Sequence, residues 1–314
     1  MIDFRYHLVS IISVFLALAV GIVLGAGPLQ ANLGDQLSDQ VAALRTEKQA
    51  LNDRLTTSEK RVDASDEYAS AVQERVVRGR LTGHRAVVVV MPSADGDLVT
   101  NLEAVITQSG AALAATVTLS ADWFDPCQAA DRSQAAGVAG AALAHGSSAS
   151  GDALLLEVLS ELLVSRTNTP TSPQRSAALK VLADADLLDS SVADLAPADL
   201  AVLVSADYAG TESLVSARSD ATRALVTSLA GSSRATVVAG GETVTAAGQP
   251  MTSDAVQAVR EQSQTAKIVA TVDHARAGDG PAAVVLAVEG ALNERIGHYG
   301  VSSGATARVP RVLP

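Results

Sequence analysis

The polar residues that could bind a ligand follow the apolar, strand-like runs of this sequence. Four segments contain most of them: "MPSADGD", "SADYAG", "AGGET" and "TVDHARAGDG". Side chains at the carboxyl ends of parallel strands can line a pocket for a small ligand. The candidates are Asp95, Asp97, Asp207, Gly240, Gly241, Glu242, Asp273 and His274. Because Asp, Ser and Gly at such junctions commonly cap helices and form turns, we favour that structural interpretation.

Residues that ligate soft metals are scattered along the chain. They are His7, His84, His145, His274 and His298, Met1, Met91 and Met251, and Cys127. Copper(I) selects clustered thiolate and thioether ligands, and neither Met-x-x-Met nor Cys-x-x-Cys spacing occurs. We therefore expect that residues 84–314 by themselves do not bind copper(I) tightly. We expect Cys127 to be a half-buried small hydrophobe, with a reactive or intermolecular thiol as the alternative.

Several sequence motifs of catalysis and nucleotide binding are missing. The chain contains no G-x-G-x-x-G, G-x-x-x-x-G-K-[ST] or His-Glu-x-x-His pattern. The sequence therefore predicts a non-enzymatic protein without a cofactor. Its net charge of −11 argues against nucleic acid as a partner.

The elements that must position these residues begin at His84. Five short apolar runs, "RAVVVVMP", "ALAATVTLS", "LAVLVSAD", "ATVVAGGE" and "AKIVATVD", alternate with helical stretches such as "GDLVTNLEAVITQSG". This order predicts an α/β domain over residues 84–314 with a mostly parallel, Rossmann-like sheet. Residues 129–189 have a helical pattern, with "TNTPTSP" as a loop, and predict a helical insertion.

The N-terminal apolar segment predicts a membrane anchor. Residues 8–27 carry no charge, and at about 1.5 Å per residue such a helix covers the roughly 30 Å of a bilayer core. A secretory signal is the alternative, but its apolar core is usually shorter. Arg5 precedes the segment, whereas Asp35 and Asp39 are the first charges after it. We therefore expect residues 1–7 in the cytoplasm and the bulk of the chain outside, in a single-pass topology.

A heptad repeat covers residues 35–80 and predicts a coiled-coil stalk. The interface positions are Leu37, Val41, Leu44, Lys48, Leu51, Leu55, Val62, Val72 and Val76. Chains that enter from one membrane would run parallel, and Arg54 would then meet Glu59, and Arg61 meet Asp66, of a second copy. We therefore expect the stalks of two copies to form a parallel homodimer. A helix lying on its own domain and a coil with a different protein are the alternatives.

Several stretches together resemble the actinobacterial MctB family, which is also called SteB. They are the opening "MIDFRYHLVSIISVFLALAVGIVLGAGPL", the heptad segment, the α/β body and "GHYGVSSGA" near the C-terminus. The resemblance implies copper transport or homeostasis in the outer envelope. It also implies a role in cell separation, as part of cell division, with a membrane partner called SteA. It supplies no copper ligands that match residues of this chain.

Candidate partner surfaces are the coil and two small aromatic groups. Trp123 and Phe124 are scarce aromatics that either fill their own core or form a binding hot spot, and His298 and Tyr299 carry the same ambiguity. Continuously apolar strands and one span do not suit a membrane pore, so we expect any copper role to be indirect. The sequence thus predicts an interaction protein of the envelope. A sensor of a small ligand or metal at the strand ends is the alternative.

Overall fold

The computed structural model describes residues 4–165, 173–188, 196–206, 212–241 and 255–311, without the side chains of residues 26–36. The chain divides into two units, Met1–Ala64 and Ser65–Pro314. Helix α1 (Phe4–Val77) begins in the first unit and ends in the second. Its backbone stays helical through Pro28, so the predicted span and stalk are parts of one helix.

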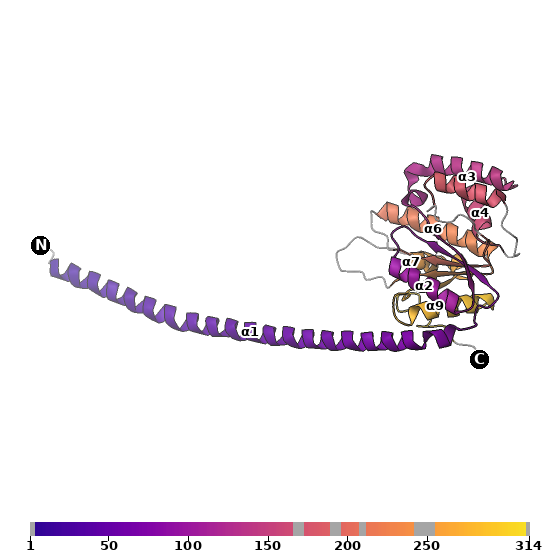
Figure 1. Ribbon diagram of the computed structural model, residues 1–314. Coiled ribbons are helices and arrows are strands. Elements are labelled where there is room, and N and C mark those ends of the chain that lie inside the picture. The colour runs from indigo at the N-terminus through magenta and orange to yellow at the C-terminus, as the bar shows by residue number, and fades with distance from the viewer. Residues whose placement is uncertain (1–3, 166–172, 189–195, 207–211, 242–254, 312–314) are drawn as a thin grey trace. The chain divides into compact units, whose positions relative to one another are not determined.

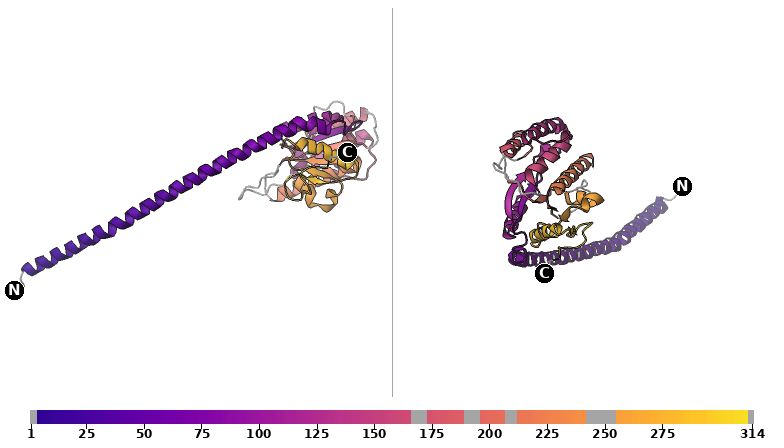
Figure 2. Two further views of the ribbon diagram at one scale, coloured as in Figure 1. Left: turned by 90° about the horizontal axis from the view of Figure 1, so that it is seen from below. Right: turned by 90° about the vertical axis from the view of Figure 1, so that its right-hand side faces the viewer.

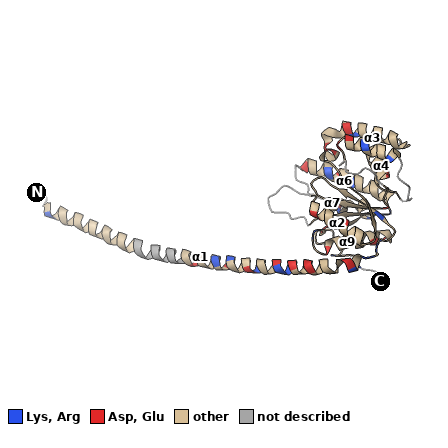
Figure 3. Cartoon of the chain, viewed as in Figure 1, with Lys and Arg blue, Asp and Glu red and all other residues tan. Residues whose placement is uncertain are grey.

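The first part of α1 has the length and composition of a membrane-crossing helix. An 18-residue window within Phe4–Gly25 has a mean hydropathy of 2.8, and none of that window is buried. In Figure 3 this part of the helix is tan from close to its N-terminal end up to the residues drawn in grey, and the sequence has no charge after Arg5 there. The Ser13 hydroxyl donates to the Val9 carbonyl oxygen at 2.8 Å, so this polar group is satisfied inside the helix. Internal satisfaction is what a bilayer core requires of a polar group.

The second unit is built on a six-stranded sheet in which every pair is parallel. Its strands are β1 (Arg85–Val90), β2 (Ala112–Thr118), β3 (Leu200–Val204), β4 (Ala235–Ala239), β5 (Ala270–Val272) and β6 (His298–Tyr299). The spatial order is β2-β1-β3-β4-β5-β6. The predicted parallel sheet is confirmed, and all five predicted runs contain a strand. The more specific Rossmann-like assignment stays a prediction.

Alternating side chains along the strands form two separate hydrophobic cores. Val87, Val89 and Met91 of β1 belong to one core, and Ala86, Val88 and Val90 to the other. Successive residues of a strand point to opposite faces, so both faces of this sheet are buried. Such burial explains why the strands are continuously apolar.

Helices cover both faces of the sheet (Figures 1 and 2). Helices α2 (Gly96–Gln108) and α9 (Gly280–Leu292) supply the core that contains Ala86. The other core is supplied by helices α3 (Ala129–Leu143), α4 (Gly151–Leu163), α5 (Pro173–Asp184), α6 (Glu212–Ser232) and α7 (Ala255–Glu261). The remaining short elements are α8 (Ser263–Ala266), η1 (Ala121–Phe124) and η2 (Pro126–Gln128).

The last turns of α1 belong to the α/β unit. The backbone N–H of Gly278 donates to Asp66 Oδ1 at 2.9 Å, and a Cβ at Gly278 would lie 2.5 Å from Asp66 Cα. Val72 and Val76 are half-buried, and Val77 is fully buried. The predicted pairing of Asp66 with a second copy therefore competes with a bond inside its own domain. For these turns the alternative of a helix on its own domain describes the structure.

Candidate functional site

At the carboxyl edge of the sheet, where a ligand was the predicted alternative, several of the described candidates make contacts within the chain. Asp95 caps α2 by accepting the N–H groups of Asp97 at 3.0 Å and Leu98 at 3.5 Å. Its Oδ2 also pairs with Arg276 Nε at 2.9 Å. The N–H of Asp97, together with the other partners, lowers the pKa of Asp95. These contacts favour the structural interpretation of Asp95.

Two glycines at this edge accommodate neighbouring groups of the protein. A Cβ at Gly241 would lie 2.5 Å from Arg276 Nη1, so the guanidinium occupies the space that a side chain would fill. Gly240 donates its N–H to the Val272 carbonyl at 2.9 Å and accepts the Ala275 N–H at 2.9 Å. The candidates Asp207 and Glu242 lie outside the described residues.

A buried ion pair organises the next part of the edge. Arg260 Nη1 donates to Asp273 Oδ2 at 2.6 Å, and the two side chains are 4% and 1% exposed. Arg260 Nε also donates to Thr271 Oγ1 at 2.9 Å, and Nη2 to the Tyr299 carbonyl at 2.8 Å. Asp273 accepts the N–H groups of Val301 at 2.8 Å and Ser302 at 3.1 Å. We call Arg260 and Asp273 the clamp, because they tie α7 and β5 to the turn after β6.

The clamp explains one of the two glycines of the "GHYG" segment. Gly300 has a φ of +135°, and a Cβ there would lie 1.8 Å from Asp273 Oδ1. A Cβ at Gly297 would lie 2.2 Å from the Tyr299 hydroxyl. Position 300 therefore requires glycine, whereas a side chain at position 297 would have to displace the end of the Tyr299 side chain. The sequence drew attention to this segment, but its role in closing the sheet as β6 was not expected.

His298 and Tyr299 are half-buried in β6. Because Arg260 donates to Thr271 Oγ1, the threonine hydroxyl is able to donate to His298 Nδ1, 2.9 Å away. Burial, with the nearby charge of Arg260, lowers the pKa of His298, which suits a neutral acceptor. Burial raises the pKa of Tyr299. Both residues contribute to the fold here, and their role as a partner surface stays a prediction.

His274 directly follows Asp273 of the clamp in the sequence. Its side chain is fully buried, with Nε2 3.8 Å from Asp279 Oδ1. Across the described part of the chain, no group of three or more His, Cys, Asp or Glu residues is arranged to hold a metal ion.

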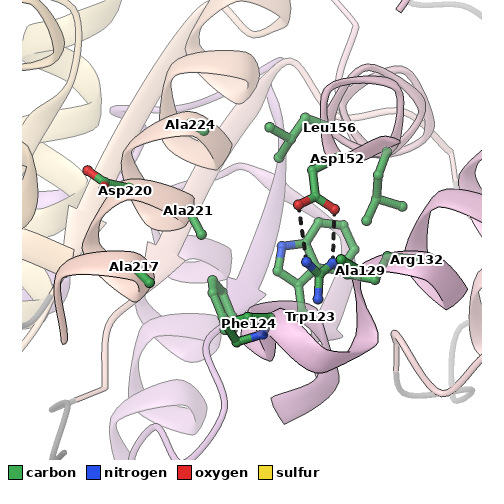
Figure 4. A pocket seen from close by; sticks show the side chains of 12 residues that line it. Trp123, Phe124, Ala129, Arg132, Asp152, Leu156, Ala217, Asp220, Ala221 and Ala224 are labelled. Carbon is green, nitrogen blue, oxygen red and sulfur yellow. Dashed lines mark hydrogen bonds and ion pairs between the residues drawn. The ribbon is translucent and has the colours of Figure 1, made fainter. Parts of the chain in front are cut away.

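A mainly apolar pocket of about 510 Å³ lies between η1, α3, α4 and α6. Figure 4 shows Trp123 and Phe124 on one side and the small side chains of Ala217, Ala221 and Ala224 on α6 opposite them. The two aromatic residues are 4% and 6% exposed. They thus fill their own core, as the first of the two predicted alternatives stated, while part of their surface lines the pocket.

One polar pair forms a wall of this aromatic pocket. Arg132 Nε and Nη2 donate to the two carboxylate oxygens of Asp152 at 3.0 and 3.1 Å, as Figure 4 shows. Nη1 donates to the Asp122 carbonyl at 3.0 Å and also to the Asp125 carbonyl. The guanidinium therefore fixes the aromatic turn to α4. The pocket has the chemistry to take an apolar side chain or small molecule.

The expectation for Cys127 was wrong. Its thiol is exposed, because residue 127 lies on the short turn η2, where the Asp125 carboxylate accepts the Cys127 N–H at 2.8 Å. This capped turn holds the residue at the surface.

A histidine bridges two carboxylates of α4. His145 Nδ1 lies 2.6 Å from Glu161 Oε2, and Nε2 lies 3.1 Å from Glu157 Oε2. Both ring nitrogens donate when the imidazole is protonated. The hydrogen bond with Glu157, assisted by Glu161 and opposed by burial, raises the pKa of His145.

This cluster predicts a pH-dependent contribution to stability. Because the folded-state pKa is raised above 6.5, the stabilisation is complete below that value and is lost as pH rises through the folded pKa. Replacing His145 with glutamine should lower the unfolding free energy by about 0.2–1 kcal/mol just below pH 6.5, where the Glu157 carboxylate is still ionised, and by less above the folded pKa of His145. Urea denaturation of both proteins across this range measures the difference. Parallel pH profiles would contradict the prediction.

An apolar stripe remains exposed on α1 in the first unit. It comprises Leu37, Val41, Leu44, Leu51, Leu55 and Val62, all heptad positions with exposures from 45% to 63%. Lys48 lies in the same seam and is exposed. The structure contains one chain, so the pairing of this stripe with a second helix stays a prediction.

Comparisons with known proteins agree on one family. The family model described as "Copper transport outer membrane protein, MctB" matches residues 1–310. "Copper transporter MctB" of Mycobacterium tuberculosis (strain ATCC 25618 / H37Rv) is 29% identical over 322 residues, covering 97% of this chain and 98% of that protein. The protein of the same name from Mycobacterium leprae (strain TN) is 29% identical over 325 residues, covering 98% of each.

Proposed function

Because the chain belongs to the MctB family of copper transport outer membrane proteins, we propose that it contributes to copper homeostasis as an anchored, non-enzymatic interaction protein of the envelope. In this proposal Phe4–Gly25 is the only span, the N-terminus is cytoplasmic, and the α/β unit lies outside. The Arg5-to-Asp35 charge asymmetry supports this orientation.

The observation that carries the interaction role is the exposed apolar stripe of α1. Leu37, Leu44 and Leu51 are 59%, 63% and 55% exposed although they are large apolar side chains at one heptad position. Repeated apolar residues at such spacing are stabilised when another helix covers them. We propose a second copy of this chain as that helix, in a parallel and in-register pair.

Charges beside the stripe support a parallel pair. Arg54 of one copy would face Glu59 of the other, and Lys48 at a seam position favours a dimer over larger assemblies. Exposed pairs contribute only about 0.2–1 kcal/mol each, so the apolar residues would supply most of the affinity. Since Asp66, Val72 and Val76 have contacts or partial burial in the α/β unit, the proposed coil ends near Val62.

We propose that the copper role is indirect and depends on a partner, such as a membrane protein of the SteA type. This is favoured by the described part of the chain, in which no group of three or more His, Cys, Asp or Glu residues is arranged to hold a metal ion. In addition, Asp95 and Asp273, two candidates for a small-ligand pocket, have carboxylates that already accept several hydrogen bonds within the chain. The same contacts weigh against the alternative of a sensor that uses the carboxyl-edge loops.

Disulfide cross-linking in membranes tests the homodimer. In a Cys127→Ala background, Leu44→Cys and Leu51→Cys should each cross-link to the same residue of a second copy under mild oxidation. Gln49→Cys, on the polar side of the helix, is the matched control and should cross-link less. Cross-linking only to a different protein would replace the homodimer by a hetero-coil.

A copper tolerance assay links the coil to the proposed function. Cells that lack the gene and express the Leu44→Asp/Leu51→Asp variant should grow as poorly on copper as cells without the protein. The Gln49→Asp variant should restore growth. If the seam variant restores full tolerance at normal membrane abundance, copper homeostasis does not depend on the coil.

A further inference from the structure

The amino edge of the sheet brings two arginines and a carboxylate into one row. Arg85 is the first residue of β1, and Asp199 and Arg234 directly precede β3 and β4. The Asp199 N–H donates to the Arg85 carbonyl at 2.9 Å, and the Arg234 N–H to the Asp199 carbonyl at 2.7 Å. These bonds hold the three residues in register on neighbouring strands.

The carboxylate in this row is occupied by groups other than the two guanidiniums. Asp199 Oδ1 accepts the backbone N–H of Arg85 at 2.7 Å, and Oδ2 lies 2.6 Å from His84 Nδ1. The side chains of Arg85 and Arg234 have no hydrogen-bond or ion-pair partner within the described ranges. Two guanidiniums therefore keep their donors for another molecule.

The row borders a hollow of about 320 Å³. It is lined by Gly83, His84, Arg85, Gly110, Ala112, Asp199 and Arg234. Two of these residues are glycines with φ values of +84° and +88°, so no side chain narrows the hollow there. Its fixed positive charges outnumber its single carboxylate, although the whole chain carries a net charge of −11.

We propose that this hollow binds a phosphate-type oxyanion. A guanidinium donates two parallel N–H bonds to a phosphate oxygen pair, and this geometry is stronger and more selective than a single charge contact. Arg85 and Arg234 supply the donors, while Asp199 holds His84 and the edge of β1 in place. The phosphate belongs either to a free phosphorylated compound or to a phospholipid headgroup, which share the same oxyanion chemistry.

Calorimetric titration of the full chain in an uncharged detergent tests the site with inorganic phosphate at constant ionic strength. The wild-type protein should show saturable binding. Arg234→Gln, at an exposed position, should weaken it about tenfold or more, because a charge-assisted hydrogen bond is lost. Arg85→Gln should do the same. Arg276→Gln, at the opposite edge of the sheet, is the control and should bind like the wild type.

Short-chain phosphatidylglycerol and phosphatidylcholine, titrated as monomers, distinguish the two sources. Tighter binding of phosphatidylglycerol than of phosphate, weakened by Arg234→Gln, would assign a lipid headgroup. Binding of phosphate alone would assign a free compound. Absence of saturable binding by any probe, or an unchanged affinity of Arg234→Gln with an unchanged melting temperature, would overturn the proposal. Should Arg85→Gln fail to fold, Arg234→Gln decides the outcome.

Discussion

Replacing Asp273 with alanine is expected to lower the free energy of unfolding by about 3–5 kcal/mol, because Arg260 would remain buried without its charged partner. The same change removes the acceptor for the N–H groups of Val301 and Ser302, so the turn after β6 loses its attachment. Chemical denaturation followed by circular dichroism measures the loss. We expect β6 to separate from β5 in the variant, which hydrogen exchange at residues 298–302 would report.

Asp184→Ala is the matched control for this prediction. Asp184 also pairs with a cation, Lys180, but the two side chains are 64% and 73% exposed. Its replacement should change stability by less than about 1 kcal/mol. Equal losses for the two variants would show that the buried clamp contributes no more than a surface pair.

The clamp also makes the free energy of unfolding depend on pH, with a defined sign. Burial raises the pKa of Asp273, but the Val301 N–H and Arg260 together outweigh this effect and hold the pKa below its ordinary value of 3.8. A depressed folded-state pKa adds stability above the unfolded value, and this is lost as pH falls through the folded pKa. The difference between wild type and Asp273→Ala should therefore shrink in strong acid.

Introducing two arginines into the apolar part of α1 is expected to abolish stable membrane insertion. Val14 and Leu18 lie near the middle of Phe4–Gly25 and are 64% and 58% exposed. An arginine at the centre of a spanning helix costs about 2.5–3.5 kcal/mol, so Val14→Arg/Leu18→Arg should lose about 5–7 kcal/mol of insertion free energy. The wild-type chain should resist carbonate extraction from membranes, and the variant should not.

The control for the anchor carries the same added charge elsewhere on the helix. Gln49→Arg/Thr56→Arg lies outside the apolar segment and away from the apolar stripe, so this variant should stay in the membrane. The exposed thiol of Cys127 reports the orientation, since an impermeant maleimide should label it in intact cells. Carbonate resistance of Val14→Arg/Leu18→Arg, or a mature N-terminus near Ala26, would contradict a permanent anchor.

Much of the fold follows from local sequence patterns. The uncharged segment, the five apolar strands and the intervening helices are encoded by hydrophobic periodicity over short windows, which does not depend on tertiary contacts. Helix α9 was missed for a related reason. It is apolar and buried over most of its surface, so it has no amphipathic pattern to identify it.

Other features depend on contacts between residues distant in the sequence, and only the tertiary structure could decide them. Val72 and Val76 continue the heptad pattern, but the structure buries them partly in the α/β unit, because one apolar stripe can pack on a second helix or on its own domain.

The short β6 lacked a strand-like run and forms because Arg260 and Asp273 bind the backbone around it. The sequence by itself thus determined the apolar span, the parallel sheet and the family, since these depend on local pattern and overall similarity. Only the tertiary structure decided which polar side chains are hydrogen-bonded within the chain, as Asp95 and Asp273 are. It also decided which guanidiniums keep N–H donors without a partner in the described residues, as Arg85 and Arg234 do. The physical reason is that such pairing depends on side chains that meet across the sheet.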